Sequence, residues 1–200
     1  MNQVKLGMIF DSPPNYKGGI NYFRNFAFAL KKVNKNINLI LFVPDDFDEL
    51  LLKDFGNHFT IAKLPILRRH SMIWLFDKII FKIFRSSHIK HKVLKRYNIE
   101  IIFTFSQLQK SKYFKILFWL PDIQFIHFPE FFTKSQRESN LKLIKYMSKQ
   151  SDRIILSSNS AYQDLCNLMD RKFGKAKILQ FVSQSNFDLN EDGKSLRYLQ

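Results

Sequence analysis

The sequence predicts an α/β protein with a doubly wound, mostly parallel sheet and helices on both faces. Two observations support this fold class. Segments of strand length alternate with segments of helical periodicity along the chain, and several strand segments are apolar from end to end. Such strands are buried on both faces, as strands of a parallel sheet are. With 46% hydrophobic residues over 200 positions, we expect one domain at residues 1–183 and a polar tail or linker at residues 184–200.

The predicted strands are apolar runs that end at turn-forming residues. The first ends at the sequence DSPPNYKGG (residues 11–19), and the second ends at Pro44. The expected strands, in chain order, are residues 4–10, 37–44, 58–65, 99–105, 113–121, 152–158 and 176–182.

The predicted helices carry apolar residues at intervals of three and four. The first begins near Ile20, and Phe23, Phe26, Ala27 and Leu30 form the face that we expect against the sheet. The sequences TKSQ (133–136) and SAYQ (160–163) are capping-box patterns that open the last two helices. These last two helices are expected at residues 133–150 and 160–170. Between them and the first helix we expect a helix at residues 45–55 and a basic helix or helix pair at residues 74–96.

The composition limits the compartment and the partners. The chain has one cysteine, Cys166, which excludes an internal disulfide framework and a cysteine-based metal cluster and favours a reducing cytosol. We see no secretory signal and no run of the roughly 18–20 apolar residues that span a bilayer. We therefore expect a cytoplasmic protein, either free or peripheral at the inner face of the cytoplasmic membrane. The net charge of +15 favours anionic partners.

The positive charge is concentrated in one segment. Residues 68–96 contain nine Lys or Arg against one acid, Asp77, and apolar residues alternate with these cations. One interpretation is an amphipathic helix on anionic lipid; the other is a helix packed on the sheet with a charged outer face. No nucleic-acid-binding motif accompanies the charge, so we expect no nucleic-acid partner. The cations assigned to the membrane patch are Lys78, Lys82, Arg85 and Lys92.

Ligands of doubly wound sheets bind beyond the carboxyl ends of the strands. Residues 11–19, 121–132 and 157–161 should meet at that edge. In the first segment, Gly18 and Gly19 allow either close contact with a phosphate at a helix N-terminus or a plain tight turn. Their spacing matches neither the dinucleotide fingerprint nor a Walker loop.

The segment WLPDIQFIHFPEFF (119–132) has the highest density of candidate groups. Asp122 can accept a proton from an attacking hydroxyl or hold a sugar hydroxyl, and His127 is a second candidate catalytic residue. Both also have structural interpretations, because Asp122 can cap a turn and His127 can satisfy one backbone group. The five histidines lack metal-ligand spacing, and no nucleophile elbow of a serine hydrolase is present. We expect no metal and no cofactor.

Three segments carry a family resemblance: SPPNYKGGINYFRNFAFAL, FWLPDIQFIHFPEFFTKSQRE and SDRIILSSNSAYQDL. In order and approximate spacing they resemble the N-terminal, Rossmann-like domain of retaining glycosyltransferases of family 4, which have the two-domain GT-B architecture. One subgroup carries W-[IV]-P-D-x-Q-H-x-H-x-P-E-F-F followed by D-R-[VI]-I-L-S-S. The similarity covers about residues 4–183.

The resemblance implies transfer of a sugar from a nucleotide-diphosphate sugar, the donor substrate, to a hydroxyl acceptor with retention at the anomeric carbon. In cell-envelope polysaccharide or lipopolysaccharide synthesis such acceptors are often lipid-linked and anionic, which suits a basic protein. By position, Gly18 and Gly19 match the loop that contacts the donor pyrophosphate. The residues that match the acceptor side of the crevice are Asn21, Tyr22, Gln124, Ser157 and Ser158.

Three departures from the family accompany the resemblance. Pro121 stands where many members have a histidine, and Phe125 replaces the first histidine of the subgroup, which leaves His127. The second domain of the family, with its basic residue and E-x7-E pair, has no counterpart here. We therefore expect the acceptor-binding half of a transferase that is nearly inactive without a second half, either lost by truncation or supplied by a separate polypeptide. The alternative is a non-catalytic basic module that binds a membrane or a partner subunit.

Overall fold

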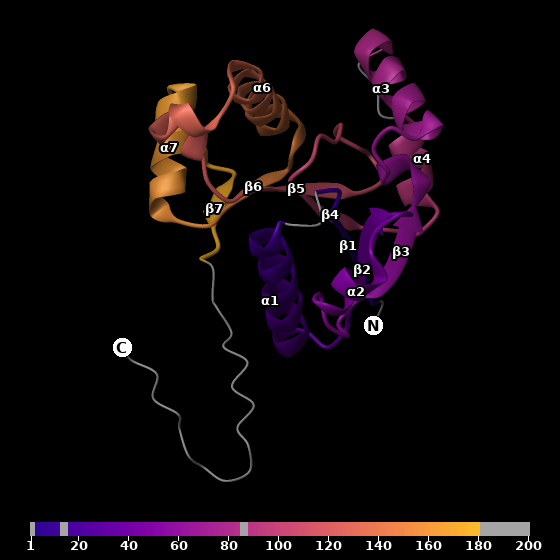
Figure 1. Ribbon diagram of the computed structural model, residues 1–200. Coiled ribbons are helices and arrows are strands. Elements are labelled where there is room, and N and C mark those ends of the chain that lie inside the picture. The colour runs from indigo at the N-terminus through magenta and orange to yellow at the C-terminus, as the bar shows by residue number, and fades with distance from the viewer. Residues whose placement is uncertain (1–2, 13–15, 85–87, 181–200) are drawn as a thin grey trace.

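The computed structural model describes residues 3–12, 16–84 and 88–180, and these residues form one seven-stranded sheet flanked by helices (Figure 1). All neighbouring strands are parallel, in the order β3-β2-β1-β4-β5-β6-β7. This Rossmann-like order confirms the predicted doubly wound α/β class. The expected boundary at residue 183 and the tail at 184–200 lie outside the described residues.

All seven predicted strands are present, and most are one or two residues shorter at their ends than the apolar runs. The strands are β1 (Val4–Ile9), β2 (Ile37–Pro44), β3 (Thr60–Leu64), β4 (Ile101–Thr104), β5 (Lys115–Leu120), β6 (Arg153–Leu156) and β7 (Ala176–Ile178). The predicted last strand, 176–182, is thus confirmed over its first three residues.

The sheet separates two hydrophobic cores, because successive side chains of a strand point to opposite faces. In β2, Leu39 and Leu41 belong to one core, whereas Ile40 and Phe42 belong to the other. Helix α1 (Lys17–Val33) supplies the first core, and α4 (His88–Lys95), α6 (Lys134–Gln150) and α7 (Asn159–Met169) supply the second. Figure 1 shows α1 on the opposite side of the sheet from α6 and α7. The helices therefore cover both faces.

The helix ends follow their capping residues and correct two expectations. Thr133 and Gln136 form the predicted capping box of α6. For α7, the predicted cap within SAYQ is wrong: the Ser158 hydroxyl accepts the Ala161 N–H, so the helix begins at Asn159. Helix α2 (Glu49–Lys53) is shorter than the predicted 45–55, because Asp48 caps it by accepting the Leu50 N–H.

The basic segment forms a helix pair, α3 (Met72–Phe84) and α4. A short helix, η1 (Pro65–Leu67), connects β3 to this pair. Helix α5 (Gln124–His127) and the turn η2 (Pro129–Phe131) follow β5 and form much of the sheet's carboxyl edge on that side. No helix within the described ranges is long and apolar enough to cross a membrane.

Candidate functional site

The strand order changes direction between β1 and β4, which places the topological switch point there. Asp11 follows β1 and Ser106 follows β4, and the Ser106 hydroxyl donates a hydrogen bond to Asp11 Oδ1. Crevices at such points are the usual ligand sites of open α/β sheets. The sequence interpretation missed this pair, although an acid directly after a buried strand is the same signal that identified Asp122.

Asp122 lies just beyond the carboxyl end of β5 and has the turn role that the structural interpretation gave it. Its Oδ1 atom accepts the Gln124 N–H at 3.3 Å, at the start of α5. The Asp122 side chain remains exposed, so its carboxylate also faces the solvent-filled crevice. A structural and a ligand-binding role are therefore compatible at this residue.

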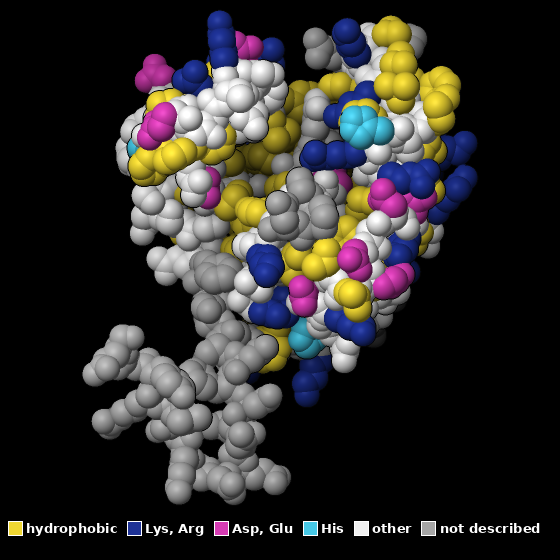
Figure 2. Space-filling view, in the orientation of Figure 1, with side chains coloured by type: hydrophobic (Ala, Val, Ile, Leu, Met, Phe, Trp, Pro, Cys, Tyr) yellow, Lys and Arg dark blue, Asp and Glu magenta, His cyan; other side chains and the backbone are white. Residues whose placement is uncertain are grey.

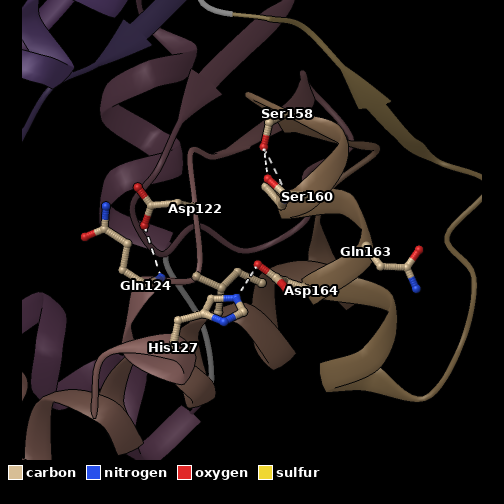
Figure 3. Close-up of a pocket in the computed structure, with 9 residues that line it drawn as sticks. Asp122, Gln124, His127, Ser158, Ser160, Gln163 and Asp164 are labelled. Carbon is tan, nitrogen blue, oxygen red and sulfur yellow. Dashed lines mark hydrogen bonds and ion pairs between the residues drawn. The ribbon is translucent and has the colours of Figure 1, made fainter. Parts of the chain in front are cut away.

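His127, at the end of α5, contacts an acid that sequence reasoning did not find. Its Nε2 atom lies 2.9 Å from Oδ2 of Asp164, which comes from the second turn of α7 (Figure 3). When Nε2–H donates to this carboxylate, Nδ1 is left as an acceptor, as a general base requires. Asp164 lies four residues after Ser160, one helical turn along α7, so periodicity alone could have placed it near the crevice.

Ser157 and Ser158 follow β6 and use their hydroxyl groups differently. The Ser157 hydroxyl accepts the indole N–H of Trp119 at 3.2 Å, which fixes it to β5. Ser158 caps α7 and lies 2.9 Å from the Ser160 hydroxyl. Of the two serines, Ser158 is the one that lines the hollow.

The ends of β5 and β6 together enclose a hollow of about 510 Å³, which we call the polar pocket. Figure 3 shows the His127 ring turned toward Asp164 and the Ser158 and Ser160 hydroxyl groups turned toward each other, whereas Gln163 points away. The polar pocket therefore combines carboxylate, imidazole, amide and hydroxyl groups. Its lining residues are Asp122, Ile123, Gln124, His127, Ser158, Ser160, Ala161, Gln163 and Asp164.

A second hollow of about 460 Å³, the apolar pocket, adjoins the polar pocket because Asp122 and Gln124 line both. Its walls include Tyr16, Phe105 and Trp119, and Figure 2 shows a hollow with hydrophobic side chains between the elements labelled α6 and α3 in Figure 1. Burial raises the pKa of the Tyr16 hydroxyl, and the nearby Asp122 carboxylate raises it further. Tyr16 therefore stays neutral and can donate a hydrogen bond in the crevice.

Gly18 and Gly19 lie in the first turn of α1 rather than in the loop before it. A Cβ at Gly19 would lie 2.5 Å from the Tyr16 ring and 3.1 Å from Phe10. The Tyr16 ring can therefore pack against residue 19 only because that residue is glycine. The Gly19 N–H donates to the Tyr16 carbonyl. Among the described residues, no side chain caps α1 and no acid stands in its first turn, which leaves its positive end for an anion.

Asn21 and Tyr22 are not among the residues that line either pocket. Tyr22 is buried, stacks on Trp119 at 4.2 Å between ring centroids and donates its hydroxyl to the Leu179 carbonyl. Asn21 Oδ1 accepts a hydrogen bond from Arg24. The structure thus brings together four of the predicted site residues: Asp122, Gln124, His127 and Ser158. Gly18 and Gly19 lie against Tyr16, which lines the apolar pocket with Asp122.

The cations assigned to the membrane patch differ in their surroundings. The electrostatic partners of Lys78 include Asp11 in the crevice, and its ammonium lies over the Trp74 ring at 5.5 Å; burial and the nearby Lys90 lower its pKa. Lys82 and Lys92 are exposed. Arg85 lies outside the described residues. Among those residues, no group of three or more His, Cys, Asp or Glu could hold a metal ion.

The comparisons with known proteins identify the fold. No protein-family model matches the chain, and no curated protein matches it. Among solved structures, a glycosyltransferase from Rickettsia africae ESF-5 aligns with 90% of this chain and 43% of its own, at a TM-score of 0.52 and 13% identity. The chain therefore spans less than half the length of that protein. The likeness shows that the two share a Rossmann-like fold over the aligned part.

Proposed function

We propose that this chain is the acceptor-binding half of a glycosyltransferase, which moves a sugar from a nucleoside-diphosphate sugar to a hydroxyl acceptor with retention. The observation that carries the proposal is the joined pair of pockets at the carboxyl edge. It combines hydroxyl-binding groups of Asp122, Gln124 and Ser158 with an aromatic wall. The fold shared with a glycosyltransferase and the sequence resemblance support the same function.

In this proposal the chain's own residues have separate roles. Asp122 and Gln124 hold the acceptor, and His127, oriented by Asp164, takes the proton of the attacking hydroxyl. The uncapped start of α1, at Gly18, contacts the donor pyrophosphate. Cations that stabilise the departing diphosphate come from a second domain, either in a longer polypeptide or in a partner. The chain alone should therefore bind acceptor but turn over poorly.

We assign the acceptor to the anionic, lipid-linked sugars of envelope polysaccharide or lipopolysaccharide synthesis, at the inner face of the cytoplasmic membrane. The chain's net charge of +15 supports an anionic acceptor, and the apolar pocket beside Asp122 offers space for a non-polar portion of it. The alternative function, a non-catalytic module that binds a membrane or partner, is favoured by one observation outside the pockets: helix α3 exposes an apolar face.

Ligand-observed NMR on the 200-residue chain tests the proposal with a panel of alkyl glycosides. We expect saturation transfer to a subset of the glycosides, with binding at least tenfold weaker for Asp122→Asn, because a lost charge-assisted hydrogen bond costs about 1.5–3 kcal/mol. Asp54→Asn is the matched control, since Asp54 is exposed at the end of α2, away from the residues that line the pockets. Equal binding by wild type and Asp122→Asn, or no binding of any glycoside, would refute an acceptor site here.

A further inference from the structure

Helix α3 turns large apolar side chains toward solvent. The residues Met72, Leu75, Phe76, Ile79 and Ile83 are 69%, 47%, 54%, 45% and 64% exposed, respectively. Their spacing of three and four residues puts them on one side of the helix, and we call them the α3 stripe. A monomeric soluble protein rarely exposes a contiguous row of this kind, so the stripe calls for a partner.

The opposite side of α3 is already packed against the protein. Phe81 meets the Tyr146 ring of α6 edge to face, with 5.5 Å between ring centroids. Asp77 is buried, and the backbone of Lys90 in α4 donates a hydrogen bond to it. The α3 stripe is therefore a second apolar face, on a helix whose inner face is already packed against the protein.

The charge around the α3 stripe is positive. Lys82 follows Ile79 by three residues and is exposed beside the stripe. In Figure 2 the hydrophobic side chains over α3, at the upper right, are bordered by Lys and Arg side chains. The one acid in residues 68–84 and 88–96, Asp77, is buried. The described cations of α4 and the approach to α3 are Arg68, Arg69, Lys90, Lys92, Lys95 and Arg96.

We propose that α3 docks this protein on an anionic lipid bilayer, lying in the plane of the interface with the α3 stripe inserted at the headgroup level. A helix of 13 residues is about 20 Å long, too short to cross the hydrocarbon core, so it lies flat. Apolar side chains on one face with Lys and Arg at its border are the arrangement that binds such a surface. The docking keeps the amphipathic-helix interpretation of residues 68–96 and assigns the contact to the exposed apolar side chains of α3 together with the cations that border them.

The positive charge of the chain indicates which partner covers the α3 stripe. A second copy of the chain would bring another net charge of +15 to the contact, and like charges oppose association. An anionic bilayer surface instead attracts this face over its whole area, which contributes about 1 kcal/mol for each Lys or Arg near the surface. Lipid is therefore the occupant that the charge and the exposed apolar row both favour.

Vesicle flotation with the 200-residue chain tests this docking. The variant Phe76→Gln plus Ile79→Gln removes two central members of the α3 stripe without changing the charge. The matched control, Val33→Gln plus Leu50→Gln, makes the same kind of change at two apolar residues that are 87% and 69% exposed on other helices. Circular dichroism melts of all three proteins verify that each is folded before flotation.

Wild type and the control should float with vesicles that contain phosphatidylglycerol and should bind phosphatidylcholine vesicles weakly. The stripe variant should bind at least about tenfold more weakly, which corresponds to about 1.4 kcal/mol. Raising the salt from about 0.1 M to about 1 M shortens the Debye length from about 10 Å to about 3 Å, and should weaken binding without abolishing it.

Three results would overturn the docking proposal: failure of the folded wild type to float with anionic vesicles, equal flotation of the stripe variant, or light scattering that shows a stripe-dependent dimer without lipid binding. The inference does not rest on glycosyl transfer. Asp122→Asn, which is expected to impair glycoside binding, should float like wild type, so failure of one proposal is distinguishable from failure of the other.

Discussion

Helices α1 and α3 are both amphipathic, yet they use their apolar faces in opposite ways. Helix α1 buries Phe23 completely in the core beneath the sheet, where its ring lies 5.3 Å from the Phe10 ring centroid. Helix α3 leaves Phe76 54% exposed although the same residue type stands on the same kind of face. Apolar residues at helical spacing therefore predict a helix, but they do not predict whether protein, water or lipid covers its apolar face.

The difference follows from what each helix packs against. Helix α1 has one apolar face, and it packs against the sheet, so α1 exposes no apolar row like that of α3. The inner face of α3 packs against the protein through Phe81 and Asp77, and the α3 stripe stays exposed. Burial of the α1 face contributes to the stability of the fold, whereas the exposed α3 face should contribute to binding.

The largest expected effect separates the two helices directly. Phe23→Ala should lower the free energy of unfolding by about 3–5 kcal/mol, because it opens a cavity among packed aromatic rings. Phe76→Ala should change it by no more than about 0.5 kcal/mol, since the ring is already half in water. Urea denaturation of both variants measures the contrast. A loss above about 2 kcal/mol for Phe76→Ala would show that the α3 stripe is packed in solution.

A smaller effect is expected at the start of α1. Gly19→Ala should cost about 1–3 kcal/mol, because its Cβ would overlap the Tyr16 ring and crowd Phe10. Gly18→Ala is the control: its nearest atom outside the backbone neighbours lies 3.8 Å away, and alanine in place of a helical glycine is neutral or stabilising by up to about 1 kcal/mol.

The Gly19 variant also tests the crevice, because a displaced Tyr16 ring changes the wall of the apolar pocket. Chemical denaturation and glycoside binding should therefore both respond at Gly19 and neither should worsen at Gly18. Equal stability of the two alanine variants would contradict the close packing of Tyr16 on Gly19.

The fold could be predicted because strand runs and helical periods are local signals. The run at residues 37–44 was bounded by Pro44, and β2 has those limits. The start of α1 was misplaced at Ile20 because glycines usually indicate a loop, whereas here they form the first turn of the helix. The cap of α7 was misplaced at Ser160, because Ser158 stands two residues earlier and its hydroxyl accepts the Ala161 N–H.

Within the candidate site, the sequence could predict only the positions of residues that directly follow a strand. Asp122 and Ser158 follow adjacent parallel strands, so topology alone brings them together. The contact between His127 and Asp164 depends on how α5 and α7 sit side by side, which no local pattern encodes. The electrostatic interaction between Lys78 and Asp11 likewise depends on the rotation of α3, and a list of cations in sequence could not show it.

The smallest expected effect concerns the inner face of α3 and appears as a dependence on pH. Burial raises the pKa of Asp77 above its ordinary value of 3.8, although the nearby Lys90 and Lys78 and, more weakly, His91 lower it in part. Oδ1 of this carboxylate has no hydrogen-bond partner among the described residues. The folded state therefore holds a proton more tightly than the unfolded state does, and ionisation of Asp77 opposes folding.

The sign of the effect follows from this linkage. The destabilisation by ionised Asp77 is fully present above its folded-state pKa and is lost as the pH falls toward 3.8, so wild type should gain stability relative to Asp77→Asn over that interval. One proton limits the gain to about 1.4 kcal/mol per pH unit. Denaturation of both proteins from neutral pH downward isolates Asp77, because groups common to both cancel. A constant difference would contradict the burial of the Asp77 carboxylate, and one that favours the asparagine variant as the pH falls would mean that the nearby cations outweigh that burial.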